Sequence, residues 1–342
     1  MLNIISRHFN NPAAGAVQKV ARNLVAGLEI IGYPYVINKS LDSCENLWIQ
    51  DDYRALIGLK KLDPKVKIVI GPNLFVMPRD IPWSIRIPIR VTYIHPSAWA
   101  AEAWRIMGYK NSKLDYWPTG IDVSEFDTRK GAQIRDKVLL YYKHRDKPGQ
   151  CGIEKIEDNL VSKNIPFQRI NYGYYKQTDY LDLLDKSKYV IWYGRQESQG
   201  LALQEAMAMG RPLLVIDVKK IGDFDGLGYK FTNKELSIPA SSAPYFDERC
   251  GLKITDLDQL PESLDLMEAS WPHFDPRGYV EENLSLDLCA RELLRKFGVD
   301  APEKSDLSQN SNLKPFVPPK FWQLSALELR WRSRGIKGLL FR

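Results

Sequence analysis

Residues 193–212 constrain the fold of this chain more than any other stretch. They follow a short apolar, β-branched and aromatic run, 189–193, which is typical of a buried strand. A helical stretch then ends at Gly210-Arg211-Pro212, and the apolar run 213–217 predicts the next strand. We therefore predict a strand–loop–helix–strand unit, the element from which parallel α/β sheets are built.

Two carboxylates lie in this unit, Glu197 where the loop meets the helix and Glu205 inside the helix. The junction exposes backbone N–H groups at Gly200 and Leu201, at the positive end of the helix dipole, and such an end suits a phosphate. An adjacent acid suits a polyol, and a nucleotide sugar carries both groups. The structural alternative is an amphipathic helix with Glu205 in solvent and Glu197 near the N-cap.

Strands and helices alternate through both halves of the chain, with a turn at Pro118 and Gly120 between the halves. The predicted strands are 2–6, 35–37, 46–49, 65–70, 91–94, 137–142, 167–172, 238–242 and 252–254, besides the two above. The other predicted helices are 17–31, 53–61, 98–107, 153–163, 178–186 with Thr178 as a cap, and a long amphipathic helix, 277–297. Such alternation implies parallel sheets covered by helices on both faces.

The composition sets the class of protein. A length of 342 residues suffices for two domains, and 44% apolar with 26% charged residues is typical of a soluble globular chain. No apolar run approaches the roughly 20 residues of a membrane span, and the start is too short for a signal peptide. The 4 cysteines are scattered, which indicates reduced thiols. We therefore expect a cytoplasmic protein.

Glu197 and Glu205 form an E-x7-E pattern within the longer string Glu-Ser-Gln-Gly…Glu-Ala-Met-Ala-Met-Gly-Arg-Pro. This string resembles the retaining glycosyltransferases of the GT-B fold, especially family 4. The segment 114–126 also resembles the Pro-x-Gly-Val-Asp-x-x-x-Phe sequence that leaves the N-terminal domain in that family. The resemblance implies an α/β fold class, with two Rossmann-like parallel-sheet domains that face a cleft.

On this resemblance we divide the chain into four parts. Residues 1–118 are expected to form the acceptor domain and residues 119–136 a linker. Residues 137–297 are expected to form the nucleotide-sugar donor domain, whose last helix returns toward the first domain. Residues 298–342 form a basic, aromatic tail. The implied reaction moves a sugar, with retention, from a nucleotide-diphosphate sugar to a glycan or lipid-linked acceptor, in surface polysaccharide or glycoconjugate synthesis.

The resemblance also implies roles for individual residues. In the family the first glutamate contacts the donor sugar and the second holds the ribose hydroxyls. Cations after the strand 137–142 would stabilise the diphosphate, although the run Lys-His-Arg-Asp-Lys departs from the family spacing, so Lys143 and Lys147 are favoured over Arg145. The alternative is a solvated, charged turn. The expected catalytic residues are Glu197 and Lys143, and the expected donor-binding residues are Lys147, Arg145, Ser198, Gln199, Gly200, Leu201, Glu205 and Gly15.

The acceptor side departs from the family. Many members have a histidine after the middle strand of the first domain, where this chain has Asn73. His95 follows the next strand, so we expect Asn73 and His95 on the acceptor side. No cofactor and no metal are expected, because side-chain cations serve the phosphates. The pairs Asp51-Asp52 and Asp223-Phe-Asp225 are similar to a metal-binding Asp-x-Asp, and we interpret both as chance.

Two rival functions remain at this stage. One is another enzyme of the same fold, a nucleotide-sugar epimerase or a phosphorylase. The other is a non-catalytic protein that binds an anionic polymer, suggested by the basic tail and opposed by the intact glutamate pair; we expect no nucleic-acid partner. The tail, 321–342, interleaves basic and aromatic residues, so we expect it to pack back on the domains, to contact an anionic membrane surface or to be disordered.

Overall fold

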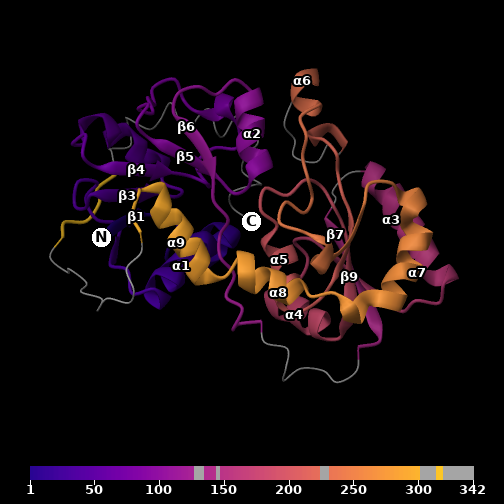
Figure 1. Cartoon of the computed structure of the whole chain (residues 1–342). Helices are drawn as coiled ribbons and strands as arrows, with labels where there is room; N and C mark the ends of the chain where they lie inside the picture. The colour runs from indigo at the N-terminus through magenta and orange to yellow at the C-terminus, as the bar shows by residue number, and fades with distance from the viewer. Residues whose placement is uncertain (127–134, 144–146, 224–230, 301–312, 319–342) are drawn as a thin grey trace. The chain divides into compact units, whose positions relative to one another are not determined.

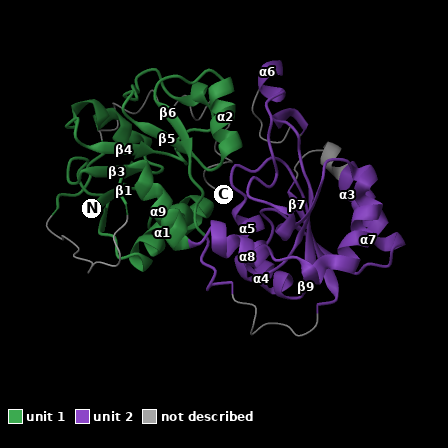
Figure 2. Cartoon of the chain, in the orientation of Figure 1, with its two compact units in different colours: residues 1–120, 286–342 green, residues 121–285 purple. Residues whose placement is uncertain are grey.

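The computed structural model describes residues 1–126, 135–143, 147–223, 231–300 and 313–318, without the side chains of 147–150 (Figure 1). The chain forms two compact units (Figure 2). Unit 1 contains Met1–Gly120 and Leu286–Arg342, and unit 2 contains Ile121–Ser285. Arg145 and the tail segment 321–342 lie outside the described residues, so the two predictions for the tail stay predictions.

Unit 1 is built on a six-stranded parallel sheet in the order β2-β1-β3-β4-β5-β6. Its buried strand residues form apolar clusters with the helices and loops that flank the sheet. The strands are β1 (Leu2–Ile5), β2 (Tyr35–Ile37), β3 (Asn46–Ile49), β4 (Lys67–Ile70), β5 (Thr92–His95) and β6 (Lys113–Tyr116). The helices are α1 (Ala16–Ile30), α2 (Ala98–Ile106) and α9 (Leu286–Lys296), with the 3₁₀ segments η1 (Pro12–Ala14), η2 (Tyr53–Lys61) and η3 (Pro78–Asp80).

Unit 2 is built on a five-stranded parallel sheet in the order β11-β10-β9-β7-β8. The strands are β7 (Lys137–Lys143), β8 (Phe167–Asn171), β9 (Ser187–Gly194), β10 (Leu213–Ile216) and β11 (Gly251–Ile254). The helices are α3 (Lys147–Ser162), α4 (Gln177–Asp185), α5 (Leu201–Ala208), α6 (Asn233–Leu236), α7 (Leu260–Ser270) and α8 (Pro276–Asn283). The described part of unit 2 also contains the 3₁₀ turns η5 (Ile221–Asp223), η6 (Glu248–Cys250), η7 (Leu257–Gln259) and η8 (Trp271–His273).

Both sheets reverse their strand order at one place. In each unit the second strand pairs on one side of the first and the third strand pairs on the other side. The switch point therefore lies between β1 and β3 in unit 1 and between β7 and β9 in unit 2. Connections leave the two central strands in opposite directions there, so loops diverge at the carboxyl end of the sheet and ligands bind in the opening. The predicted pair of Rossmann-like parallel sheets is confirmed.

The prediction of one long helix at 277–297 is wrong, because the helix is interrupted at residues 284–285, between α8 and α9. Leu284 leaves helical geometry, with φ −133° and ψ 14°. Its carbonyl accepts the backbone N–H of Ile121 at 2.7 Å, and Ser285 forms a parallel bridge with Ile121. The domain division predicted from the sequence placed residues up to 297 in the second domain, whereas α9 belongs to unit 1.

The packing of α9 on α1 explains that membership. A Cβ added to Gly27 of α1 would lie 2.2 Å from the carbonyl oxygen of Leu286, so the glycine lets the two backbones approach closely. The indole Nε1 of Trp117 donates to the carbonyl of Cys289 at 2.7 Å. A glycine contact and a buried hydrogen bond thus fix α9 in unit 1.

Several smaller expectations also differ from the structure. Residues 238–242 form no strand beyond one isolated bridge between Lys220 and Pro239. Residues 113–116 form the edge strand β6, where the sequence suggested only a connecting segment. The N-cap of α4 is Lys176 instead of Thr178. The helix α7 was not predicted, and 53–61 is a 3₁₀ instead of an α-helix.

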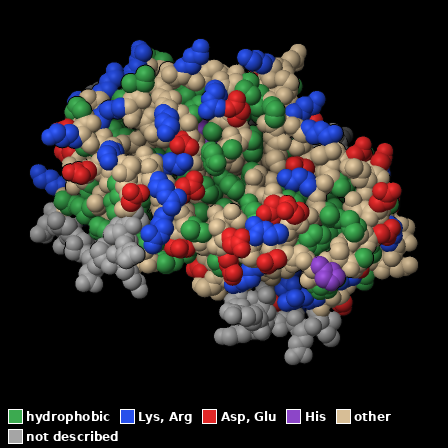
Figure 3. Space-filling model, viewed as in Figure 1, with side chains coloured by type: hydrophobic (Ala, Val, Ile, Leu, Met, Phe, Trp, Pro, Cys, Tyr) green, Lys and Arg blue, Asp and Glu red, His purple; other side chains and the backbone are tan. Residues whose placement is uncertain are grey.

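One face of the protein carries side chains of both charges (Figure 3). On the face that Figure 3 shows, Lys and Arg side chains are interspersed with Asp and Glu over both units. The net charge of +6 is therefore not gathered into a single basic patch on that face. Within the described part of the chain, no helix has both the length and the apolar character needed to cross a bilayer.

Candidate functional site

The polar residues that follow the strands of unit 2 gather at the switch point between β7 and β9. Lys143 is the last residue of β7 and lies opposite Gly194, the last residue of β9. Nζ of Lys143 lies 2.5 Å from Oε1 of Glu197, and the two side chains are only 13% and 10% exposed. The same Nζ lies 4.3 Å from the ring centroid of Tyr172. The two residues expected to be catalytic are thus in contact at the edge where α/β sheets bind ligands.

The N-terminus of α5 lies in the same loop. Gly200 is the N-cap, and its φ of +82° is a left-handed conformation that favours glycine. Its carbonyl accepts the backbone N–H of Gln204 at 3.0 Å, and Leu201 is the first helical residue. The side chain of Gln199 is buried and donates to the side-chain oxygen of Gln204 at 3.1 Å, whereas Ser198 is exposed. The loop therefore presents Ser198 outward and uses Gln199 to hold its own shape.

Glu205 lies inside α5 and is only 4% exposed. Its Oε2 accepts a hydrogen bond of 2.8 Å from Nε2 of Gln177, the first residue of α4. Tyr175 interacts electrostatically with both carboxylates of the E-x7-E pattern. The pKa of Tyr175 is raised to about 12, mainly by burial and further by the charges of Glu205 and Glu197. The hydrogen bond with Tyr141 acts in the opposite direction and lowers this pKa. The two glutamates therefore border one common cluster of side chains.

Aromatic residues form the support of this cluster. The ring of Tyr141 stacks on Trp192 with centroids 4.1 Å apart, and its hydroxyl lies 2.7 Å from that of Tyr175. Tyr180 contacts both tyrosines edge-on or tilted, and its hydroxyl donates to the carbonyl of Ala202 in α5 at 2.6 Å. Rigid rings with satisfied hydroxyls thus hold the start of α5 against the sheet.

Asp217 fixes the loop that carries Glu197, a role that the sequence did not reveal. Its carboxylate accepts hydrogen bonds from the Ser241 hydroxyl at 3.0 and 3.1 Å and from the Ser242 backbone N–H at 2.5 Å. Lys253 lies 3.4 Å away and compensates the charge. The carbonyl of Ser241 then accepts the backbone N–H of Glu197 at 2.9 Å. The available signal was the position of Asp217, a carboxylate at the last residue of the strand predicted at 213–217.

Of the three predicted diphosphate-binding cations, only Lys143, at the end of β7, has a described side chain. Arg145 lies outside the described residues. Lys147 is the first residue of α3, and its side chain is outside the description as well. The predicted donor-side roles of these two residues stay predictions.

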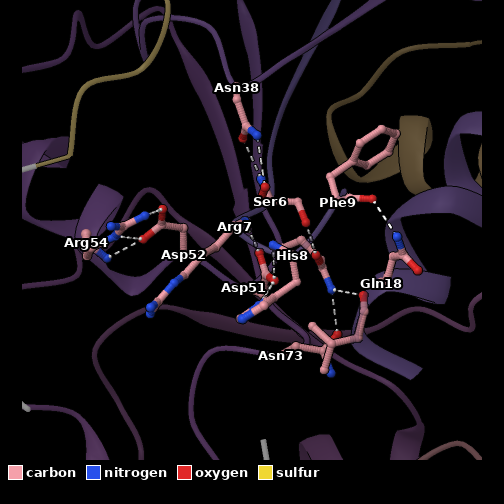
Figure 4. Close-up of polar contacts among 12 residues, drawn as sticks. Ser6, Arg7, His8, Phe9, Gln18, Asn38, Asp51, Asp52, Arg54 and Asn73 are labelled. Atoms are coloured by element: carbon pink, nitrogen blue, oxygen red, sulfur yellow. Dashed lines mark hydrogen bonds and ion pairs between the residues drawn. The ribbon is translucent and has the colours of Figure 1, made fainter. Parts of the chain in front are cut away.

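In unit 1, Gly15 and Asn73 lie at the carboxyl edge of the sheet. Gly15 is the N-cap of α1 with φ +52° and ψ −120°, and no atom lies within 4 Å of an added Cβ. The side-chain oxygen of Asn73 accepts a hydrogen bond of 2.9 Å from Nε2 of Gln50. The same Nε2 also donates a hydrogen bond to the carbonyl of Val17 (Figure 4). Gly15 is therefore open to a ligand, whereas Asn73 is bound within the protein.

His95 belongs to the core of unit 1. It is 3% exposed, stacks on Tyr93 with centroids 4.9 Å apart, and lies 4.5 Å from the ring of Trp104. Burial lowers the pKa of His95 to about 3, so the imidazole is neutral at ordinary pH. This placement differs from the acceptor-side role that the resemblance suggested, because the side chain at the end of β5 points into the aromatic core.

The aspartates that are similar to a metal motif are held by other groups. Asp51 accepts a hydrogen bond from His8, and Asp52 binds Arg54 at 2.6 and 2.7 Å (Figure 4). Asp223 accepts the backbone N–H groups of Lys219 and Lys220, and Asp225 lies outside the described residues. Among the residues that the structure describes, no three His, Cys, Asp or Glu side chains gather as metal ligands would.

Similarity between this chain and known proteins is found at the level of structure. No protein-family model matches it, and no curated protein matches its sequence. Among solved structures it is similar to a sucrose-phosphate synthase from Thermosynechococcus elongatus, at 12% identity and a TM-score of 0.52, over 87% of this chain and 98% of the other.

Two further similar structures are HepE of Anabaena in complex with UDP and glucose, and WaaG, a glycosyltransferase involved in lipopolysaccharide biosynthesis. The first has 10% identity and a TM-score of 0.48, over 87% of this chain and 99% of HepE. WaaG has 12% identity and a TM-score of 0.47, over 87% of this chain and 100% of WaaG. The similarity to the synthase, together with two parallel sheets that share one strand order, establishes that the chain has the GT-B fold.

Proposed function

We propose that the chain is a retaining glycosyltransferase that uses a nucleotide-diphosphate sugar. The carrying observation is the contact of Lys143 with Glu197 at the switch point of unit 2, beside the N-terminus of α5. A cation and a helix N-terminus suit a diphosphate, and a held carboxylate suits sugar hydroxyls. The fold similarity and the E-x7-E string support the same reading.

The proposed roles of the residues depend on the charges that develop as the sugar leaves the diphosphate. When the glycosidic bond to the diphosphate breaks, the leaving group gains negative charge and the anomeric carbon becomes cationic. Fixed donors aimed at the leaving group therefore stabilise the transition state more than the ground state. Lys143 and the N–H groups at Gly200 and Leu201 act on the diphosphate, and Glu197 positions the sugar and stabilises the developing positive charge.

Glu205 serves the nucleoside. A buried carboxylate with one oxygen held by Gln177 retains acceptor capacity for ribose hydroxyls. The bond from Gln177 also orients the group before the ligand arrives, which lowers the ordering cost of binding. Ser198 and Gln199 complete the loop around the donor, and Lys147 and Arg145 assist Lys143 at the phosphates.

Unit 1 binds a glycan or lipid-linked acceptor, and the open backbone at Gly15 makes this glycine a donor-binding residue. Attack occurs on the face that the leaving group departs from, with no protein nucleophile and no metal. The protein acts in the cytoplasm on surface polysaccharide or glycoconjugate precursors, and the tail brings it to the membrane if it does not pack on the domains.

A comparison of two similar ion pairs tests the donor site. Lys143→Met should weaken the binding of UDP or GDP about 10-fold or more, because a hydrogen bond to a charged group contributes about 1.5–3 kcal/mol. Lys188→Met is the matched control, since Lys188 forms a 2.5 Å pair with Glu268 at the other end of β9 and is 15% exposed.

Calorimetry of both variants with nucleoside diphosphates and their sugars gives the answer. Equal affinities in wild type and Lys143→Met would remove the diphosphate role from Lys143. Product analysis of the wild type then separates transfer to an acceptor from the two rival activities, isomerisation of the donor and phosphorolysis.

A further inference from the structure

The connection between β4 and β5 covers part of the unit 1 sheet without an α-helix (Figure 1). All of residues 71–91 are described, and three turns follow one another there, each of which begins at a proline. A backbone hydrogen bond closes each turn, at 3.2 Å in Pro78–Ile81, 2.9 Å in Pro82–Ile85 and 3.0 Å in Pro88–Val91. Because each proline fixes its own φ, the turns have little conformational freedom.

The last residue of each turn anchors it to the core of unit 1. Ile85 and Val91 are buried in one apolar cluster, and Ile81 is partly buried against the same cluster. Ile87 is buried there as well and adds an anchor between the second and third turns. The side of this segment that faces the sheet is therefore apolar, and the side chains between the anchors are left at the surface.

Two of the turns hold a large apolar side chain out in solvent. Trp83 is 79% exposed and Ile89 is 82% exposed, and each is the second residue of its turn. By contrast, Trp48, Trp117 and Trp192 are completely buried. Most of the Trp83 ring and of the Ile89 side chain therefore remains available for contact with an apolar partner.

Basic residues accompany these two side chains and outnumber the acids. Residues 57–91 contain seven Lys or Arg and two Asp, which gives this stretch a net charge of +5. One of the two acids, Asp80, is buried and accepts the backbone N–H of Met77 at 3.1 Å. All seven basic residues are exposed, namely Lys60, Lys61, Lys65, Lys67, Arg79, Arg86 and Arg90.

The 3₁₀ segment η2 and the proline turns belong to one surface. Leu56 and Leu59 of η2 are buried in the same apolar cluster as the anchors of the turns. Arg90, in the third turn, donates to the carbonyls of Leu62 and Val66 at 3.2 and 2.7 Å. These bonds tie the turn to the residues that follow η2, and since they go to carbonyl groups, Arg90 keeps its positive charge.

We propose that the exposed side of residues 57–91 is a docking surface for an anionic lipid bilayer. Trp83 and Ile89 enter the interface between headgroups and acyl chains, and the basic side chains bind lipid phosphates. A nucleic acid would use the charges and the aromatic ring, whereas the aliphatic Ile89 gains only from an apolar phase. The surface lies in unit 1, apart from the tail, and the inference stands without the proposed function because vesicle binding needs no donor.

The test is co-sedimentation of the full chain with vesicles of phosphatidylcholine alone and of equal parts phosphatidylcholine and phosphatidylglycerol. Wild type should bind the anionic vesicles at low salt and dissociate as salt is added. Trp83→Ser/Ile89→Ser should weaken this binding about 10-fold or more, because two apolar side chains no longer leave water. Lys60→Gln/Lys61→Gln should weaken it about fivefold for each lysine. Trp83→Phe should retain most of the binding, since the ring is kept.

Matched control variants lie in unit 2. Val161→Ser/Leu266→Ser removes two apolar side chains that are 66% and 52% exposed, and Lys219→Gln/Lys220→Gln removes two exposed lysines. Both controls should bind vesicles as wild type does. Urea unfolding should give the wild-type stability for Trp83→Ser/Ile89→Ser, because neither side chain belongs to the core.

Three results would overturn the docking surface. The first is wild-type protein that stays in solution with anionic vesicles at low salt. The second is wild-type binding by Trp83→Ser/Ile89→Ser, with a loss only in the tail variant Trp322→Ser/Trp331→Ser. The third is retention on heparin without vesicle binding, which would make an anionic polymer the partner. Calorimetry with UDP and GDP tests the proposed donor site separately, so its failure and that of the docking surface are distinguishable.

Discussion

Replacing Glu205 with glutamine separates a ribose-binding carboxylate from a buried structural one. Glutamine has nearly the same shape, and its amide oxygen can still accept the 2.8 Å hydrogen bond from Gln177. The free energy of unfolding should therefore change by less than about 1 kcal/mol. The amide, however, has one acceptor oxygen where the carboxylate has two, and that oxygen is the one that Gln177 occupies.

The expected loss is therefore one charge-assisted hydrogen bond to a ribose hydroxyl. Such a bond contributes about 1.5–3 kcal/mol, so the Kd for a nucleoside diphosphate should rise by about 10- to 150-fold. Calorimetry measures the Kd, and urea unfolding measures the stability. Glu268→Gln is the matched control, because Glu268 is a paired carboxylate on α7 and contacts Lys188 at the start of β9.

Three results would contradict this reasoning. A Kd within about twofold of wild type would mean that Glu205 does not touch the nucleotide. An equal loss of affinity in Glu268→Gln would mean that the effect comes from a general loosening of unit 2. A large loss of stability in Glu205→Gln would instead identify Glu205 as a structural carboxylate.

Three further predictions follow from other parts of the molecule. Donor turnover should survive EDTA, and loss with chelation followed by recovery with Mn²⁺ would refute the assignment of phosphate stabilisation to Lys143. Gly27→Ala should lower the free energy of unfolding by about 1–3 kcal/mol in urea titrations, since the new methyl would lie 2.2 Å from the Leu286 carbonyl oxygen. The pKa of His95 is lowered from 6.5 to about 3, so protons bind the unfolded state preferentially and its stabilising contribution, complete above pH 6.5, is lost as pH falls toward 3. Wild type should thus lose about 2 kcal/mol more than His95→Phe between pH 6.5 and 5, and parallel pH profiles would contradict this burial argument.

Local patterns were enough to predict most elements. Apolar β-branched runs such as 189–193 and 213–217 form strands because they are buried on both faces of a parallel sheet. Gly200 and Gly210 mark the ends of α5, since both have the positive φ that favours glycine. Where local signals conflict with long-range contacts, the prediction failed: residues 277–297 have one amphipathic pattern, yet the bridge at Ile121 divides them into α8 and α9.

The sequence by itself determined the two alternating halves, the strand–loop–helix–strand unit and the two glutamates in it. Only the tertiary structure decided which side chains meet. Lys143 reaches Glu197, and His8 reaches Asp51, because the strand order of each sheet places the first strand beside the third. His95, which we predicted from the sequence as a site residue, is buried in the structure. Strand order and side-chain direction depend on the packing of the whole sheet, so no local stretch of sequence encodes them.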